Sequence, residues 1–192
     1  MTTKPNWGIP QLIRVPIPEI RVLIPEAAIQ QRVRDLAAEI NHTVAGSVDV
    51  LILLKGAWIF GADLARSLAR VNAVHFAKAK SYLGSATTPE KICWNWPEEL
   101  TPQGKTLLIL DDILDSGATI KEAKVLAQKA GFQEIFSVVL MRKVRADLPL
   151  GEADFIGFDI PDLFVLGYGL DHDERYRTLP FIGVLTETLG AT

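Results

Sequence analysis

Hydrophobic positions along the chain follow two spacings, one typical of amphipathic helices and one typical of buried strands. Within residues 26–41, apolar side chains recur every three or four positions, namely Ile29, Val33, Leu36 and Ile40. This spacing places them on one face of a helix. Two further helices are expected, at residues 58–71 and at residues 118–130, where Gly131 offers a C-terminal cap.

Short continuous apolar runs predict strands that are buried on both faces. They cover residues 48–54, 73–79, 106–112 and 136–141, and shorter segments follow at 154–158 and 163–168. Because strands and helices alternate, we predict an α/β fold with a mostly parallel sheet flanked by helices on both faces. Periodicity is absent from Ser81 to Leu100, and a stretch of this length is typical of a functional lid or a disordered loop.

Composition narrows the class of protein. The chain has 192 residues, 48% of them hydrophobic, which is enough for one domain with a full core. A net charge of −3 gives no electrostatic footprint for a nucleic-acid partner. We find no signal peptide and no apolar run near the ~20 residues that cross a bilayer, so we expect a cytoplasmic protein without a membrane partner. Cys93 is the only cysteine, which fits a reducing compartment.

The strongest chemical signal lies in residues 106–119, where an apolar run ends at Asp111 and Asp112. The turn that follows it reads Asp115, Ser116, Gly117, Ala118 and Thr119. A helix N-terminus after a strand attracts anions, and glycine and hydroxyl groups suit a phosphate. Because the carboxylates would repel that phosphate, the segment predicts a divalent cation such as Mg²⁺ beside it.

This segment resembles the phosphoribosyl pyrophosphate (PRPP) signature of the type I phosphoribosyltransferases. Three further segments narrow the resemblance to the hypoxanthine-guanine phosphoribosyltransferases, and Lys143 accompanies them. They are Leu54-Lys55-Gly56-Ala57, similar to the pyrophosphate loop; Lys80-Ser81-Tyr82, similar to the start of the mobile active-site loop; and residues 164–177, similar to the purine site. The family's type I fold is thereby implied, with a small hood subdomain over the sheet.

The resemblance also implies a domain organisation. It covers residues 20–185, so residues 20–192 would form a single phosphoribosyltransferase domain. Its core would span about 45–145, and its hood would combine about 20–44 with 146–185. Residues 1–19 form a proline-rich tail that matches nothing we can name.

For PRPP, the resemblance implies a role for each motif. Asp115, Ser116, Gly117, Ala118 and Thr119 would hold the 5-phosphate. Asp111 and Asp112 would accept hydrogen bonds from the ribose hydroxyls of the Mg²⁺-bound substrate. Lys55 and Gly56 would present backbone N–H groups to pyrophosphate, often through a non-proline cis peptide, and Arg177 would neutralise pyrophosphate from the far side.

For the base, the resemblance implies that Phe164 stacks on the purine and that Lys143 donates to its 6-oxo group. Val165 and Asp171 would offer backbone carbonyls to the ring edge, and Asp171 would also bind a second Mg²⁺. Asp115 is the candidate catalytic proton acceptor or donor. The implied reaction moves the phosphoribosyl group from PRPP to hypoxanthine or guanine, for purine salvage, in a homodimer or homotetramer.

Three positions depart from the commoner family pattern. Ser116 replaces threonine, Asp111 replaces glutamate and Lys78 replaces arginine. Alternative functions are a xanthine-preferring transferase, or a regulator of the same fold that binds nucleotides or RNA without catalysis. A regulator would predict a basic surface or an attached DNA-binding segment, and this acidic chain shows neither. The segments at Lys143 and Phe164 argue against a pyrimidine or adenine transferase.

Overall fold

A six-stranded sheet forms the centre of the computed structural model, which describes residues 20–82, 91–97, 100, 102, 106–144 and 152–186. The strand order is β4-β3-β2-β5-β6-β7, and only β3 and β4 pair antiparallel. The strands are β2 (Val48–Leu54), β3 (Val71–Tyr82), β4 (Lys91–Asn95), β5 (Thr106–Leu114), β6 (Glu134–Val144) and β7 (Phe155–Pro161). The predicted mostly parallel sheet is therefore confirmed.

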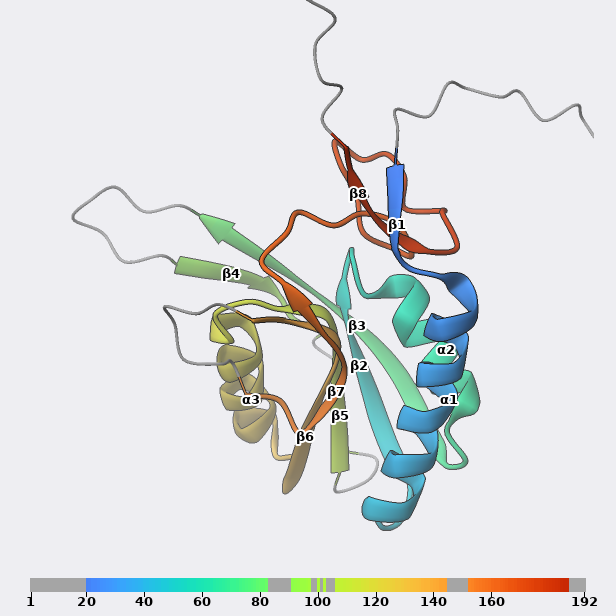
Figure 1. Cartoon of the computed structure of the whole chain (residues 1–192). Coiled ribbons are helices and arrows are strands. Elements are labelled where there is room, and N and C mark those ends of the chain that lie inside the picture. Colours follow the sequence, from blue (N-terminus) through green and yellow to red (C-terminus); the bar gives the residue numbers. More distant parts are fainter. Residues whose placement is uncertain are drawn as a thin grey trace, which may run out of the picture.

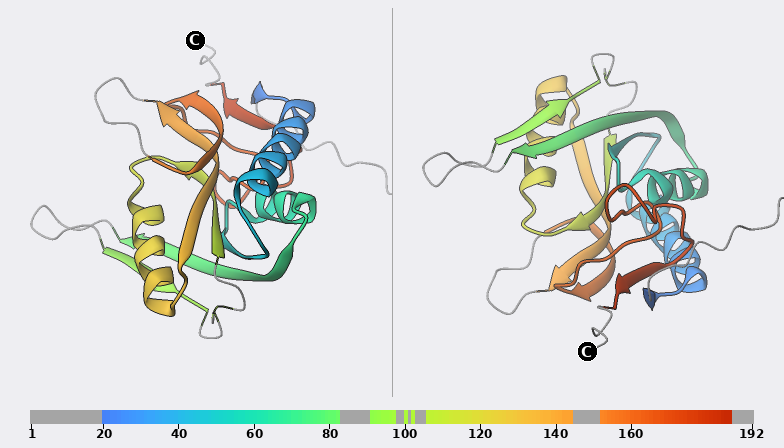
Figure 2. Two further views of the ribbon diagram at one scale, coloured as in Figure 1. Left: turned by 90° about the horizontal axis from the view of Figure 1, so that it is seen from below. Right: turned by 90° about the horizontal axis from the view of Figure 1, so that it is seen from above.

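Helices cover both faces of the sheet, as Figures 1 and 2 show. The helices α1 (Glu26–Thr43) and α2 (Trp58–Ser67) lie on one face, and α3 (Ala118–Ala130) lies on the other. Side chains of a strand alternate between its two faces. In β5, Leu108 and Leu110 accordingly pack in the cluster of α1 and α2, whereas Leu107 and Ile109 pack in the cluster of α3. This explains why residues 107–110 of β5 are apolar without interruption.

A small hood lies beyond the carboxyl edge of the sheet (Figure 1). Its two strands, β1 (Ile20–Ile24) and β8 (Ile182–Leu185), pair antiparallel. Tyr168 attaches the hood to α2, because its buried hydroxyl donates to Asp63 Oδ2 at 2.7 Å. Burial, with the Asp63 carboxylate beside it, raises the pKa of Tyr168 well above its ordinary value, so the phenol stays a donor.

The helix after β2 is shorter than predicted. It ends at Ser67, whereas the sequence suggested residues 58–71. Leu68 is extended, and the Ala69 N–H donates to Asn41 Oδ1 of α1 at 3.0 Å. This contact with another element competes with a further helical turn, and Val71 begins β3 instead.

Two further expectations about the elements were wrong in detail. Part of the stretch without periodicity is strand, since β3 continues to Tyr82 and pairs with β4. The hood is smaller than expected: α1 packs on the sheet face, and β7 is an edge strand of the central sheet paired with β6.

No helix in the described ranges is long and apolar enough to cross a membrane.

Candidate active site

The candidate active site lies at the carboxyl edge of the sheet, where β5 extends beyond its pairing with β2. That pairing ends at Ile52 with Leu110, but β5 stays paired with β6 as far as Leu114. Asp111 and Asp112 therefore lie inside β5, although the sequence suggested that they close the strand. Because β2 no longer pairs with β5 at these two residues, the loop that follows β2 lies beside them instead.

Gly56, in that loop, lies directly against the carboxylate of Asp112. A β-carbon at position 56 would overlap Asp112 Oδ2, so the backbone reaches the carboxylate only because residue 56 is glycine. The peptide bond between Leu54 and Lys55 is cis, as the resemblance implied for this loop.

The same loop also touches the hood. A β-carbon at Gly169, whose φ is +105°, would overlap the Gly56 carbonyl oxygen. The loop is thus enclosed by Asp112 of β5 on one side and by Gly169 of the hood on the other.

Asp111 and Asp112 form a pair of adjacent, poorly solvated carboxylates. The Asp112 N–H donates to Asp111 Oδ1 at 3.0 Å, and the Ile113 N–H donates to Asp112 Oδ1 at 2.9 Å. Burial raises the pKa of Asp111, and repulsion from Asp112 raises it further. Burial also raises the pKa of Asp112, against the opposing effects of its hydrogen bonds and of the Arg177 charge. A bound cation would favour the ionised form of both groups.

The turn after β5 encloses a small polar cavity of about 60 Å³. Its lining includes Asp111, Asp115, Ser116, Gly117 and Thr119. Gly117 precedes α3 with φ +79°, and the Ala118 N–H lies 3.4 Å from Ser116 Oγ. Because the first N–H groups of a helix lack partners within it, this cavity at the start of α3 suits an anion.

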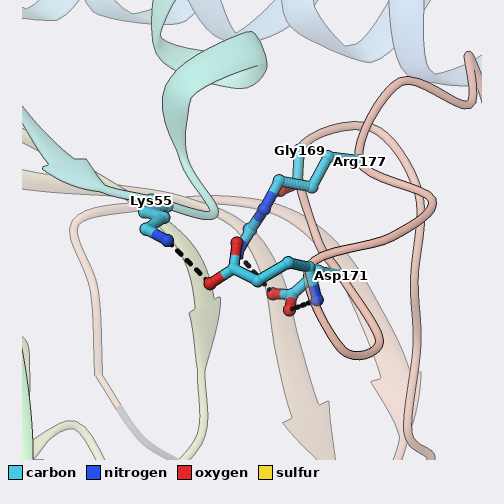
Figure 3. Close-up of polar contacts among 5 residues, drawn as sticks. Lys55, Gly169, Asp171 and Arg177 are labelled. Carbon is cyan, nitrogen blue, oxygen red and sulfur yellow. Dashed lines mark hydrogen bonds and ion pairs between the residues drawn. The ribbon is translucent and has the colours of Figure 1, made fainter.

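Two cations, Lys55 of the loop after β2 and Arg177 of the hood, share one carboxylate as partner (Figure 3). Lys55 Nζ lies 2.6 Å from Glu174 Oε1, and Arg177 Nη2 lies 3.0 Å from Glu174 Oε2. Arg177 also pairs with Asp171 Oδ1 at 2.8 Å and donates to the Gly169 carbonyl at 2.8 Å. The hydrogen bonds from Lys55 and Arg177 lower the pKa of Glu174 to about 2.

Of the residues expected to bind the base, Lys143 lies near the end of β6, and Phe164 lies in the segment that follows β7. Lys143 Nζ lies 2.9 Å from Asp162 Oδ1 and 3.8 Å from Asp115 Oδ2, and its side chain is only 16% exposed. Phe164 is 62% exposed, and its ring meets the edge of His172 with centroids 5.6 Å apart. An apolar ring this exposed leaves surface on which a planar ligand could stack.

Most of the expected site residues are thus at one edge of the sheet. Ser81 and Tyr82 are the last two residues of β3, and residues 83–90 of the expected mobile loop lie outside the described residues. The sequence reasoning missed Glu174 as a partner of both cations, and it missed Asp162. Asp162 comes near Lys143 only through the pairing of β6 with β7, in which Ile160 aligns with Lys143, and the sequence alone gave no signal for it.

Comparison with known proteins gives a consistent result. The model of the phosphoribosyl transferase domain family matches residues 25–173. The hypoxanthine-guanine phosphoribosyltransferase of Bacillus subtilis is 37% identical over 169 residues, which is 86% of this chain and 92% of that protein. The hypoxanthine phosphoribosyltransferase of Escherichia coli K12 is 38% identical over 170 residues, 85% of this chain and 94% of that protein.

A solved structure agrees with these relatives. The hypoxanthine-guanine phosphoribosyltransferase of Bacillus anthracis superposes with a TM-score of 0.79 at 33% identity, covering 88% of this chain and 100% of that one. The chain therefore belongs to the phosphoribosyltransferase family. Within that family it groups with the hypoxanthine and hypoxanthine-guanine phosphoribosyltransferases, the enzymes of purine salvage.

Proposed function

We propose that the chain transfers the 5-phosphoribosyl group of PRPP to a 6-oxopurine, hypoxanthine or guanine, and releases pyrophosphate. One observation supports this above all others. An anion cavity, a carboxylate pair and two cations lie together at one edge of the sheet, and Lys143 lies beside Asp115 of that cavity. PRPP offers a phosphate, ribose hydroxyls and a pyrophosphate, which match the first three features.

PRPP would bind across the start of α3 and the Gly56 loop. The 5-phosphate would enter the cavity formed by Asp115, Ser116, Gly117, Ala118 and Thr119. Asp111 and Asp112 would accept hydrogen bonds from the ribose hydroxyls. The backbone N–H groups of Lys55 and Gly56, together with the Arg177 guanidinium, would hold the pyrophosphate. Asp112 and the loop are already in contact, so ribose and pyrophosphate would be bound side by side.

The base would lie between Phe164 and Lys143. The ammonium of Lys143 would donate to the 6-oxo group, and the backbone carbonyls of Val165 and Asp171 would accept from the 2-amino group of guanine. Xanthine presents an oxygen there and should be the poorest of the three bases. In the reaction, the bond from ribose C1′ to pyrophosphate breaks and a bond to a purine nitrogen forms. The proton of that nitrogen would pass to the carboxylate of Asp115.

Mg²⁺ is the cofactor that we propose for this site. Burial raises the pKa of Asp111 and of Asp112, and a cation beside these adjacent carboxylates would favour their ionised form. Among the described residues, no group of three or more acidic, histidine or cysteine side chains could hold a metal. A Mg²⁺ ion that keeps several waters and takes its remaining ligands from the substrate needs no such group of side chains. Asp171 is the candidate ligand of a second Mg²⁺ ion. The ion would neutralise the leaving pyrophosphate.

The direct test incubates the purified chain with PRPP, Mg²⁺ and hypoxanthine. The proposal predicts a nucleoside monophosphate and pyrophosphate in equal amounts. If PRPP is bound but neither product forms with hypoxanthine or guanine, the transferase assignment fails. A non-catalytic regulator of the same fold would then be the better hypothesis. A homodimer or homotetramer stays a prediction from the resemblance, and a cytoplasmic location stays a prediction from the sequence.

A further inference from the structure

The carboxylate of Glu174 lies between the two cations of the proposed pyrophosphate subsite. Each of its oxygens pairs with a different cation, Oε1 with Lys55 at 2.6 Å and Oε2 with Arg177 at 3.0 Å. These cations come from distant parts of the chain, Lys55 from the loop after β2 and Arg177 from the hood. One carboxylate thus links the Gly56 loop to the hood.

We propose that Glu174 is an internal anion that occupies the pyrophosphate subsite of the free enzyme and must leave it when pyrophosphate binds. This inference rests on the proposed function, since it concerns the same subsite. Pyrophosphate and a carboxylate would compete for the same two positive charges. Because pyrophosphate must break both ion pairs of Glu174 to bind, its affinity would be lower than for an unoccupied subsite. The return of Glu174 to Lys55 and Arg177 would favour release of the product.

The surroundings of Glu174 permit this movement. Its side chain is 65% exposed, so a displaced carboxylate would return to water and not to an apolar interior. Exposed ion pairs contribute little to stability and exchange readily with solvent. By contrast, Arg177 keeps two further contacts, to Asp171 and to the Gly169 carbonyl, which would hold its guanidinium in place when Glu174 leaves.

The local backbone gives no reason of its own for glutamate at this position. Asp173 and Glu174 are the central residues of a two-residue turn closed by His172 and Arg175, and their φ values are 53° and 60°. Turns with two positive φ angles favour glycine, asparagine and aspartate. The contacts of the glutamate side chain therefore give the better account of this residue.

The test compares two neutral variants of neighbouring residues. Glu174→Gln removes the charge that faces Lys55 and Arg177. Asp173→Asn makes the same change of net charge one residue away, on a side chain that is 88% exposed and pairs with His172. Glu174→Asn is a second variant at the same position, because asparagine suits the left-handed backbone and is too short to reach Lys55.

Isothermal titration calorimetry with inorganic pyrophosphate and Mg²⁺ gives the readout, with ribose 5-phosphate as the second ligand. Both Glu174 variants should bind pyrophosphate roughly three- to tenfold more tightly than the wild type, as expected for two exposed ion pairs. Their affinity for ribose 5-phosphate, which would bind at Asp115 to Thr119, should not change. Asp173→Asn should match the wild type with both ligands.

Unchanged or weaker pyrophosphate binding by the Glu174 variants would overturn the inference, and weaker binding would mean that Glu174 holds Lys55 and Arg177 in a binding position. An equal gain in Asp173→Asn would also overturn it, because net charge alone would then explain the effect. Transferase assays of the wild type separate the two proposals. Activity with unchanged pyrophosphate affinity rejects only the role of Glu174, whereas absence of transfer rejects the proposed function together with it.

Discussion

Gly56 and Asp112 are in contact across the gap between β2 and β5, with the backbone of one against the carboxylate of the other. The contact joins the loop proposed to bind pyrophosphate to the acid proposed to bind ribose. It forms because β5 continues two residues past Asp112 while its pairing with β2 has already ended. The proposed geometry of PRPP binding would therefore depend on the absence of a side chain at position 56.

Gly56→Ala tests this dependence. The added β-carbon would displace the Asp112 carboxylate, and a misplacement of about 1 Å can reduce rate by about 10²-fold. We expect kcat/KM for PRPP to fall by about that factor, with little change in melting temperature. Gly46→Ala is the control away from the site: a β-carbon there meets no atom within 4 Å, but its φ of +79° disfavours alanine, so this variant should lose stability and keep kcat/KM. Wild-type kinetics in Gly56→Ala would show that the contact has no part in the reaction.

The carboxylate pair Asp111 and Asp112 of β5 should lower the free energy of unfolding of the ligand-free enzyme at neutral pH. The pKa of Asp111 in the folded protein is raised well above its ordinary value of 3.8, mainly by burial. A group with a raised pKa stabilises the fold below its unfolded pKa, and this contribution is lost as the pH rises through the folded pKa. At about pH 7.5 the ionised carboxylate therefore opposes folding.

Asp111→Asn removes this charge but keeps the oxygen that accepts from the Asp112 N–H. Urea unfolding of the ligand-free variant should give a higher free energy of unfolding than the wild type at about pH 7.5, and a difference near zero at about pH 3. Its affinity for PRPP should fall at the same time. A variant less stable than the wild type at neutral pH would contradict the electrostatic account of the pair.

Asp115 should affect chemistry more than binding. Asp115→Asn keeps the size of the side chain but cannot take the purine proton, so turnover should fall by roughly 10²–10⁴-fold while PRPP affinity changes little. Single-turnover kinetics, together with PRPP binding measured by calorimetry, separate the two effects. Wild-type turnover in a folded Asn variant would remove the proposed role of this residue.

Mg²⁺ should be required for transfer. Excess EDTA should abolish product formation, and added Mg²⁺ should restore it, because the carboxylates at Asp111 and Asp112 would otherwise repel PRPP. Circular dichroism in EDTA should remain that of the folded protein, since no metal cage holds the described residues together. Full activity in excess EDTA would contradict the proposal.

The sequence predicted the elements whose patterns are local. The buried run of β5 and the turn from Asp115 to Thr119 were visible because an apolar strand, acids and hydroxyls follow one another directly. The length of β5 was not predictable in the same way, since its last residues pair only with β6. Likewise, β1 pairs with β8 from the far end of the chain, and no local sequence pattern indicates such a partner.

Within the site, the functional residues were easier to predict than the contacts between them. The motifs pointed to Lys55, Arg177 and Lys143 as separate functional groups. Their partners Glu174 and Asp162 depend on how the hood folds over the sheet, which the spacing of residues does not specify. The helix after β2 was predicted too long for a similar reason, because its end is set by a contact with Asn41 of α1.

In the proposed function, the choice of base would follow from the donor-only character of Lys143. Its ammonium can pair with the 6-oxo group of hypoxanthine or guanine, but the 6-amino group of adenine would present hydrogens to it. A hydrogen bond to a charged group contributes about 1.5–3 kcal/mol, and Lys143 is mostly buried, so a preference of at least ~10²-fold for 6-oxopurines is expected. Lys143→Ala should weaken the use of hypoxanthine sharply, whereas the adjacent Arg142→Ala, which breaks a pair with Asp159, should not.

The most direct test of the proposed function is a panel of bases offered with PRPP and Mg²⁺, with kcat/KM measured for hypoxanthine, guanine, xanthine and adenine. The account predicts rapid use of hypoxanthine and guanine, poorer use of xanthine and at least ~10²-fold slower use of adenine. Conversion of adenine as efficiently as hypoxanthine would contradict the assignment of the purine site, even if the PRPP site were correct.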